Sequence, residues 1–270
     1  MATAGGGTIG KALEVLDSVA AFGRPVRFGE LLEGSPFPKA TLFRFVQTLA
    51  EQGMLAYDPD RQTYAPGVRL VRLAHSAWAQ SSLGAVARPH LDSLAAKVGE
   101  TVHLAQLDRA QVLYVDKRNA SSPVEMFSDA GKVGPAYCTG VGKAMLAFEP
   151  EQSLERIIAQ QSFHRFTEHT YTTPEALRAE LAQIRARGHA YDREEHEPGI
   201  ICIAVPILTS RGRCLGALSI TGSTARTSLS RLDGYINDLR ATARGIAEES
   251  KDWRFPQTDT CPKGPREDET

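Results

Sequence analysis

The sequence predicts an α+β protein built from two domains that are joined by a helix. Residues 8–66 contain three stretches with helical spacing, followed by two short strand-like segments. Residues 67–82 are rich in alanine and have the spacing of a connecting helix. Residues 83–254 mix helical and strand patterns and include two strongly apolar runs, which predicts a second α/β domain.

Composition sets limits on function before any motif is considered. The chain has 270 residues, of which 42% are hydrophobic, enough for one large core or two modest ones. No apolar run approaches the about 18 residues of a membrane span, and no secretory signal is present, so we expect a cytoplasmic protein with no membrane partner. Four cysteines without C-x-x-C spacing predict free thiols. The net charge of -1 means that DNA binding would depend on local placement of Lys and Arg.

The first domain is predicted to be a winged helix-turn-helix. Gly23 and Pro25 end the first helix, Pro38 suits the first turn of the third helix, and Gly53 ends it. Three helices followed by a β-ribbon is the order of this motif, in which the third helix enters the major groove of DNA. The predicted helices span residues 9–20, 28–33 and 38–53, and the predicted strands span 54–57 and 63–65.

The third helix has one apolar and one polar face. Its apolar stripe is predicted to face the core and consists of Leu42, Phe45, Val46 and Leu49. The opposite face and the turn of the ribbon carry donors suited to phosphates and base edges. A solvated charged face is the alternative for this helix taken alone, but the order of elements favours DNA. The candidate DNA-binding residues are Lys39, Thr41, Arg44, Gln47, Thr48 and Arg61.

The most apolar part of the chain is a predicted hairpin of strands 200–208 and 215–220. Apolar residues on both faces predict central strands in a sheet that is covered on both sides. A few convergent polar groups in an apolar pocket are typical of a small-molecule site. The alternative is a sheet core whose hydroxyls bond to neighbouring backbone. The polar positions in and before the hairpin are Asp192, Cys202, Ser219 and Thr221.

A Gly-rich segment before Lys143 fails the test for a phosphate loop. Tyr137 stands where the first glycine of that motif is required, and Ala144 stands where a hydroxyl is required. What remains is the start of a helix at Gly140, whose N-H groups and positive dipole end suit a carboxylate. Elsewhere we expect strands at 101–107, 111–116 and 124–127, a long terminal helix at 229–253 and a disordered tail at 255–270.

Three segments, in the same order, resemble the IclR family of bacterial transcriptional regulators. They are P-K-A-T-L-F-R-F-V-Q-T-L in the third helix, T-G-V-G-K-A at 139–144, and the acidic E-E-H followed by G-I-I-C-I-A-V-P-I and A-L-S-I-T-G. The resemblance spans residues 8–253. It implies a GAF-like effector domain, palindromic operator DNA as partner, and assembly as a homodimer or a dimer of dimers. The effector-pocket residues that it implies are Met126, Gly140, Val141, Asp192, Ile200, Cys202, Ser219 and Thr221.

Shorter segments are similar to the 2-keto-3-deoxygluconate repressor branch of the family, which handles sugar acids. They read E-T-V-H-L, V-L-Y-V-D-K and D-W-R-F-P. We therefore expect a ligand-responsive regulator, a repressor rather than an activator, whose effector is a small hydroxy or keto acid such as a sugar acid. The rival effector is a planar aromatic acid, which would prefer an aromatic lining that the implied pocket residues lack.

Two other kinds of site use the same residues. Cys202 beside His196 or His103 could be a nucleophile with its base, and these three with Cys138 and Asp192 could surround a zinc ion. Neither set has a specific spacing, and a thiol inside an apolar run behaves as a small hydrophobe with a raised pKa. We expect no catalytic residue, no cofactor and no metal ligand, with a metal in the pocket kept as an alternative.

Overall fold

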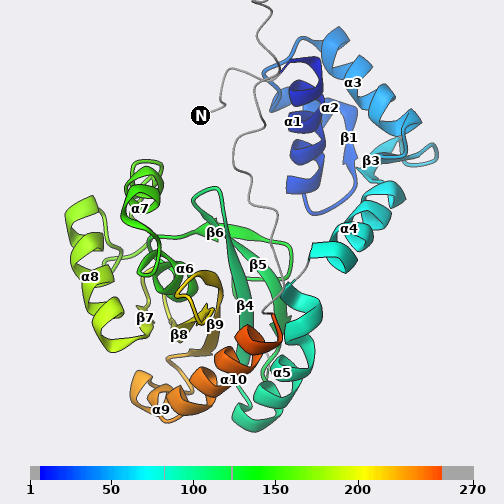
Figure 1. Ribbon diagram of the computed structural model, residues 1–270. Coiled ribbons are helices and arrows are strands. Elements are labelled where there is room, and N and C mark those ends of the chain that lie inside the picture. Colours follow the sequence, from blue (N-terminus) through cyan, green and yellow to red (C-terminus); the bar gives the residue numbers. More distant parts are fainter. Residues whose placement is uncertain (1–6, 82, 123, 251–270) are drawn as a thin grey trace, which may run out of the picture. The chain divides into compact units, whose positions relative to one another are not determined.

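The computed structural model describes residues 7–81, 83–122 and 124–250, and it separates the chain into two compact units (Figure 1). The first unit ends at Gln80 and the second begins at Ser81. The predicted α+β class is confirmed. The end of the predicted terminal helix and the predicted tail, residues 251–270, lie outside the described residues. No helix within the described ranges is long and apolar enough to cross a bilayer.

The first unit has the predicted order of three helices and a β-ribbon. A small antiparallel sheet of order β1-β3-β2 packs with the helices. The apolar stripe of α3 is buried against Val15, Leu16 and Val19 of α1, so the polar face of α3 is directed outward. The elements are α1 (Thr8–Ala21), β1 (Val26–Arg27), α2 (Phe28–Glu33), α3 (Lys39–Glu51), β2 (Leu55–Asp58), β3 (Thr63–Pro66) and α4 (Val68–Ser81).

The second unit is a six-stranded antiparallel sheet of order β6-β5-β4-β9-β8-β7, covered by helices on both faces (Figure 1). Helices α5 and α10 pack on one face and on each other, and α6 packs on the other face with α8 behind it. The strands are β4 (Thr101–Asp108), β5 (Gln111–Arg118), β6 (Val133–Pro135), β7 (Ala190–Arg193), β8 (Ile200–Leu208) and β9 (Cys214–Ser223). The helices are α5 (Leu83–Val98), α6 (Gly140–Leu146), α7 (Glu151–Ile158), α8 (Pro174–Arg187), α9 (Leu229–Asp233) and α10 (Ile236–Glu249).

The predicted apolar hairpin is the interior of this sheet. Strands β8 and β9 pair along their whole length, with Ala204 opposite Ser219, and each has a further strand on its outer side. Their side chains are buried on both faces, as the continuous apolar pattern predicted. Polar side chains on this hairpin are therefore shielded from solvent and lie inside the second unit.

Two predictions about the second unit are wrong, and one of its strands was not predicted. Residues 124–127 do not form a strand, because the backbone N-H of Phe127 donates to the Glu197 carboxylate (2.9 Å) instead of to a neighbouring strand. The acidic segment before the hairpin contains an edge strand, β7, with Asp192 opposite Cys202. The terminal helix is divided at Gly234 into α9 and α10.

Gly67, which precedes α4, packs directly on the backbone that ends α3. Its N-H donates to the Met54 carbonyl (2.8 Å), and a Cβ at position 67 would lie 2.2 Å from the carbonyl oxygen of Gly53. No side chain fits at that distance unless the backbone moves. Gly67 therefore holds the start of α4 against the rest of the first unit.

We predict that Gly67→Ala lowers the free energy of unfolding of the first unit by about 1–3 kcal/mol, the usual cost of overpacking. Gly29→Ala is the matched control, because a Cβ at Gly29 in α2 meets no heavy atom within 4 Å. That variant should be neutral or slightly stabilising, since alanine favours a helix. Urea denaturation followed by circular dichroism measures both, and equal effects of the two substitutions would contradict the assigned contact.

Candidate functional site

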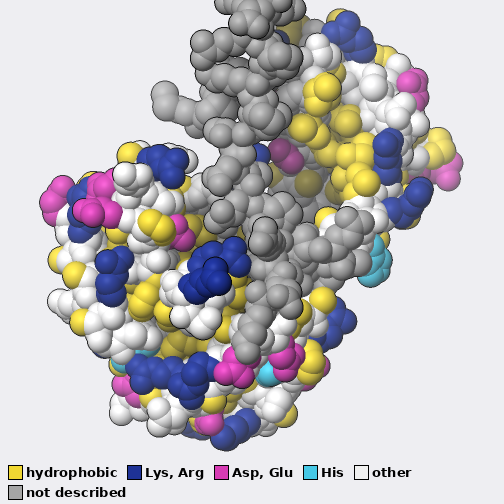
Figure 2. Space-filling model, in the orientation of Figure 1, with side chains coloured by type: hydrophobic (Ala, Val, Ile, Leu, Met, Phe, Trp, Pro, Cys, Tyr) yellow, Lys and Arg dark blue, Asp and Glu magenta, His cyan; other side chains and the backbone are white. Residues whose placement is uncertain are grey.

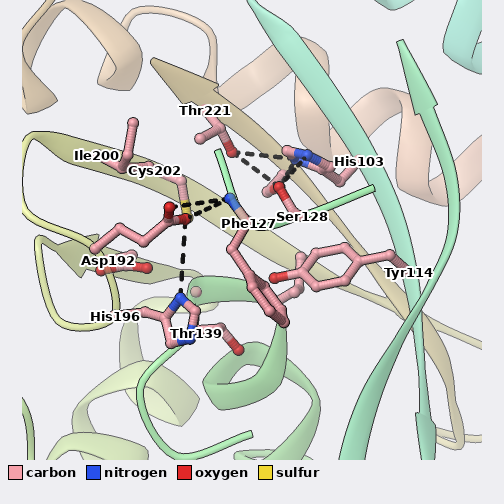
Figure 3. A pocket seen from close by; sticks show the side chains of 14 residues that line it. His103, Tyr114, Phe127, Ser128, Thr139, Asp192, His196, Ile200, Cys202 and Thr221 are labelled. Atoms are coloured by element: carbon pink, nitrogen blue, oxygen red, sulfur yellow. Dashed lines mark hydrogen bonds and ion pairs between the residues drawn. The ribbon is translucent and has the colours of Figure 1, made fainter. Parts of the chain in front are cut away.

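A cavity lies in the second unit between the sheet and the start of α6 (Figure 3). All the pocket residues implied by the resemblance line it, except Met126; the next residue, Phe127, lines it instead. The lining residues are His103, Tyr114, Phe127, Ser128, Thr139, Gly140, Val141, Asp192, His196, Glu197, Ile200, Cys202, Ser219 and Thr221.

The register of the sheet brings the predicted polar positions into one row. Asp192 on β7 is opposite Cys202 on β8, and Cys202 is opposite Thr221 on β9. Directly opposed residues point to the same face of a sheet, so the three side chains meet on the side that α6 covers. Gly140 lets α6 approach this row closely, because a Cβ at position 140 would lie 2.3 Å from the Cys202 sulfur.

His103 on β4 holds three hydroxyl groups together behind the cavity. Its Nδ1 lies 3.3 Å from both Ser219 Oγ and Thr221 Oγ1, and its Nε2 lies 2.9 Å from Ser128 Oγ. Burial, and to a smaller degree the charge of Lys117, lowers the pKa of His103 to about 3. The imidazole is therefore neutral at physiological pH, with one N-H and one acceptor nitrogen.

A buried charge cluster lies behind Asp192. Lys143 of α6 is fully buried and forms an ion pair with the buried Glu195, and its ammonium lies 4.8 Å from the centre of the Tyr171 ring. Asp192 accepts a hydrogen bond from the Glu195 N-H (2.8 Å). Burial, and next the charge of Glu195, raises the pKa of Asp192 to about 7. Asp192 is thus largely protonated in mildly acidic solution.

The buried cysteines do not have the chemistry of a nucleophile. Burial raises the thiol pKa of both Cys138 and Cys202, whereas a nucleophile requires the thiolate. Among the residues that the structure describes, no three or more His, Cys, Asp and Glu side chains are grouped to hold a metal ion.

Comparison with known proteins identifies the family. The model of the bacterial transcriptional regulator IclR C-terminal domain matches residues 75–248, and that of the IclR helix-turn-helix domain matches residues 8–59. The chain belongs to the IclR family of transcriptional regulators.

Individual relatives of this IclR-family chain agree over nearly its full length. It is 32% identical over 242 residues to the HTH-type transcriptional regulator KdgR of Escherichia coli K12, an alignment that covers 89% of this chain and 92% of the relative. It is 28% identical to the transcriptional repressor IclR of the same organism, over 83% of each chain. The crystal structure of Thermotoga maritima IclR superimposes with a TM-score of 0.71 at 30% identity, covering 90% of this chain and 98% of that one. The predicted membership of the family, and the likeness to its KdgR branch, are confirmed.

Sequence reasoning missed Tyr114 and Phe127 in the lining of this regulator's cavity, and it named His103 and His196 only as possible partners of Cys202. Tyr114, Phe127, His103 and His196 all line the cavity, and the rings of Phe127 and His196 are 5.0 Å apart (Figure 3). The pocket residues implied by the resemblance are not aromatic, but these neighbouring side chains give the cavity the aromatic lining that a planar acid would prefer. Phe127 and His196 lie outside regular elements, so periodicity carries no signal for them.

The proposed DNA-binding side chains of the IclR-family helix-turn-helix lie on α3 and in the β2–β3 turn. Lys39, Arg44, Gln47 and Thr48 are exposed, Thr41 is partly buried, and Arg61 is exposed in the turn. Figure 2 shows dark-blue side chains spread along the part of the first unit that carries these elements. DNA contact by these residues stays a prediction.

We predict that Lys143→Met lowers the free energy of unfolding of the second unit by about 3–5 kcal/mol, because Glu195 would be left buried and unpaired. The double substitution Lys143→Met with Glu195→Gln should recover part of this loss. Arg178→Met is the control, since Arg178 and Glu155 form an exposed ion pair, and such pairs contribute little to stability. Chemical denaturation measures all three, and similar losses in Lys143→Met and Arg178→Met would refute the structural role of the buried pair.

Proposed function

We propose that this IclR-family regulator is a repressor whose affinity for a palindromic operator is controlled by a small organic acid bound in the cavity. Residues 8–66 would bind DNA, residues 67–82 would connect the domains, and residues 83–254 would bind the effector. A single wing and helix cover too short a site for a specific operator, so we expect a homodimer or a dimer of dimers on twofold-related half-sites. The repressor role is supported by the relative that is named a transcriptional repressor.

The observation that carries the effector proposal is the composition of the cavity wall. The hydroxyl-bearing residues Ser128, Thr139, Ser219 and Thr221 line the cavity together with the apolar side chains of Val141 and Ile200. A ligand with several oxygens on a short carbon skeleton fits such a wall, because hydroxyls both donate and accept hydrogen bonds. A sugar acid or a simple keto acid has this chemistry.

An aromatic acid is a second candidate, and one specific observation favours it. The rings of Tyr114, Phe127 and His196 form one side of the cavity and would contact a planar ligand edge-on or face-on. A sugar acid would instead place its C-H groups against these rings. Titration with both classes therefore separates the candidates.

Helix α4 is the covalent connection between the proposed DNA-binding and effector domains. An effector changes DNA affinity only if it binds the two states of the protein with different affinity. Coupling of about 1–3 kcal/mol is typical of such regulators, which corresponds to a change in operator affinity of about 5- to 150-fold.

We predict that Arg44→Ala weakens operator binding at least about tenfold in a gel-shift assay and lowers its dependence on salt, because Arg44 would contact a phosphate or a base edge. Effector binding should be unchanged. Arg88→Ala, on α5 of the second unit, is the matched control and should leave operator affinity unaltered. Full operator affinity in Arg44→Ala would exclude α3 as the recognition helix in the proposed orientation.

We predict that affinity for gluconate or pyruvate falls as pH rises from about 6 to about 8. Below pH 7 Asp192 is mostly protonated and neutral; above it, ionisation places a second negative charge beside the bound anion. One such proton changes affinity by up to about tenfold per pH unit. Asp192→Asn, which mimics the neutral acid, should bind these anions with little dependence on pH, as measured by calorimetric titration. The same pH dependence in wild type and variant would assign the effect to another group.

A further inference from the structure

The hydroxyl groups of the cavity wall are not independent of one another, because His103 contacts three of them. His103 is only 2% exposed and lies opposite Ser219 in the register of β4 and β9. Its Nδ1 is 3.3 Å from Ser219 Oγ and 3.3 Å from Thr221 Oγ1, and the two oxygens are 3.4 Å apart. Its Nε2 is 2.9 Å from Ser128 Oγ. The tautomer of one imidazole therefore sets the direction of three hydroxyl protons.

The two tautomers give opposite hydrogen bonds. If Nε2 carries the proton, it donates to Ser128, and the lone pair of Nδ1 accepts from either Ser219 or Thr221. The proton of that hydroxyl then points to His103 and is not available to a ligand in the cavity. If Nδ1 carries the proton, it donates to both oxygens, Ser128 donates to Nε2, and the protons of Ser219 and Thr221 remain available to the cavity.

The distances favour the second arrangement. Equal separations of 3.3 Å from Nδ1 to two oxygens are those of a three-centre bond, in which one N-H is shared between two acceptors. A single lone pair on Nδ1 would instead draw one hydroxyl closer than the other. At Nε2 there is one close oxygen, that of Ser128, and this separation fits a hydrogen bond in either direction, so the Nδ1 side decides between the tautomers.

The charges around the cavity make donors on this wall useful to an anion. No Lys or Arg is among the described residues that line the cavity, whereas Asp192 and Glu197 line it on other elements. An acid would therefore keep its oxygens away from those carboxyl groups. The ammonium of Lys117, which donates to the Ser128 carbonyl (2.8 Å), adds positive charge behind the hydroxyl wall.

We infer that His103 is the positioning residue of this site: with its proton on Nδ1 it directs the hydroxyl protons of Ser219 and Thr221 into the cavity, where they receive the carboxylate or keto oxygen of the effector. This assignment rests on the proposed function, in which the cavity binds a small organic acid. It also accounts for the surroundings of His103, a buried histidine whose two ring nitrogens both lie within hydrogen-bond distance of hydroxyl oxygens.

The tautomer can be measured in the wild-type protein. In the full-length chain labelled with ¹⁵N-histidine, the side-chain shifts of Nδ1 and Nε2 distinguish the two neutral forms, and His103→Phe assigns the signal. We expect the Nδ1-H form, unchanged between about pH 5 and about pH 8 because His103 does not titrate there. A His103 spectrum of the Nε2-H form, in free protein and with ligand, would overturn the inference.

Two substitutions separate the nitrogens of His103. The amide of His103→Asn can replace Nδ1 and donate to Ser219 and Thr221, whereas the longer side chain of His103→Gln replaces Nε2 and leaves the Nδ1 position empty. Titrated with pyruvate and with gluconate, the Asn variant should stay within about threefold of wild type. The Gln variant should lose about tenfold or more, as for one lost hydrogen bond to a charged group. Thermal melting reports whether each variant is folded.

A double-substitution cycle tests whether His103 acts through the hydroxyls. Ser219→Ala should cost about tenfold in acid affinity in wild type, but clearly less in the His103→Gln background, since the oriented hydroxyl is already lost there. Equal costs in both backgrounds, or a Gln variant that binds as tightly as the Asn variant, would overturn the role of His103 and leave the proposed function intact. A wild-type protein that bound neither acid would refute the proposed function itself. If the Gln variant does not fold, the tautomer measured in wild type decides.

Discussion

The ion pair between Lys143 and Glu195 is the interaction on which the architecture of the site depends. It joins α6 to the loop after β7, and that loop is also held by hydroxyls of Thr167 and Thr170, which donate to the carbonyls of Glu194 and Glu195. The anchored loop presents His196 and Glu197 to the cavity. Desolvation of a buried pair offsets much of its attraction, so the pair contributes mainly to conformation. The Lys143 ammonium is paired only when the loop that carries Glu195 lies against α6.

This arrangement leaves the cavity polar, with no Lys or Arg among the described residues that line it and with Glu197, whose pKa is lowered, as a charged carboxylate. Lys143 is neutralised by Glu195, His103 is kept neutral by burial, and Asp192 carries its proton in mildly acidic solution. A ligand in this cavity would therefore contact mainly groups that donate or accept hydrogen bonds, and few groups that attract it by charge alone. Such a wall selects ligands by the positions of their oxygens.

The sequence predicted those parts of the site that lie on regular elements. The both-faced apolar pattern located β8 and β9, and their few polar positions, Cys202, Ser219 and Thr221, do line the cavity. Periodicity could not find contacts made by irregular backbone. Phe127 reaches the cavity because its N-H bonds to Glu197, a residue 70 positions away, and this pairing leaves no local pattern. The same limit caused the wrong strand at 124–127, whereas Tyr114 lies on the predicted strand 111–116 and was missed because the order of the strands in the sheet was unknown.

The close approach of Gly140 to Cys202 limits which substitutions these two positions can accept. A Cβ at position 140 would lie 2.3 Å from the sulfur, so neither residue can grow while the other is kept. A larger residue at 140 requires a smaller one at 202, and the exchange would move cavity volume from one wall to the other. The shape of this end of the cavity therefore depends on positions 140 and 202 together.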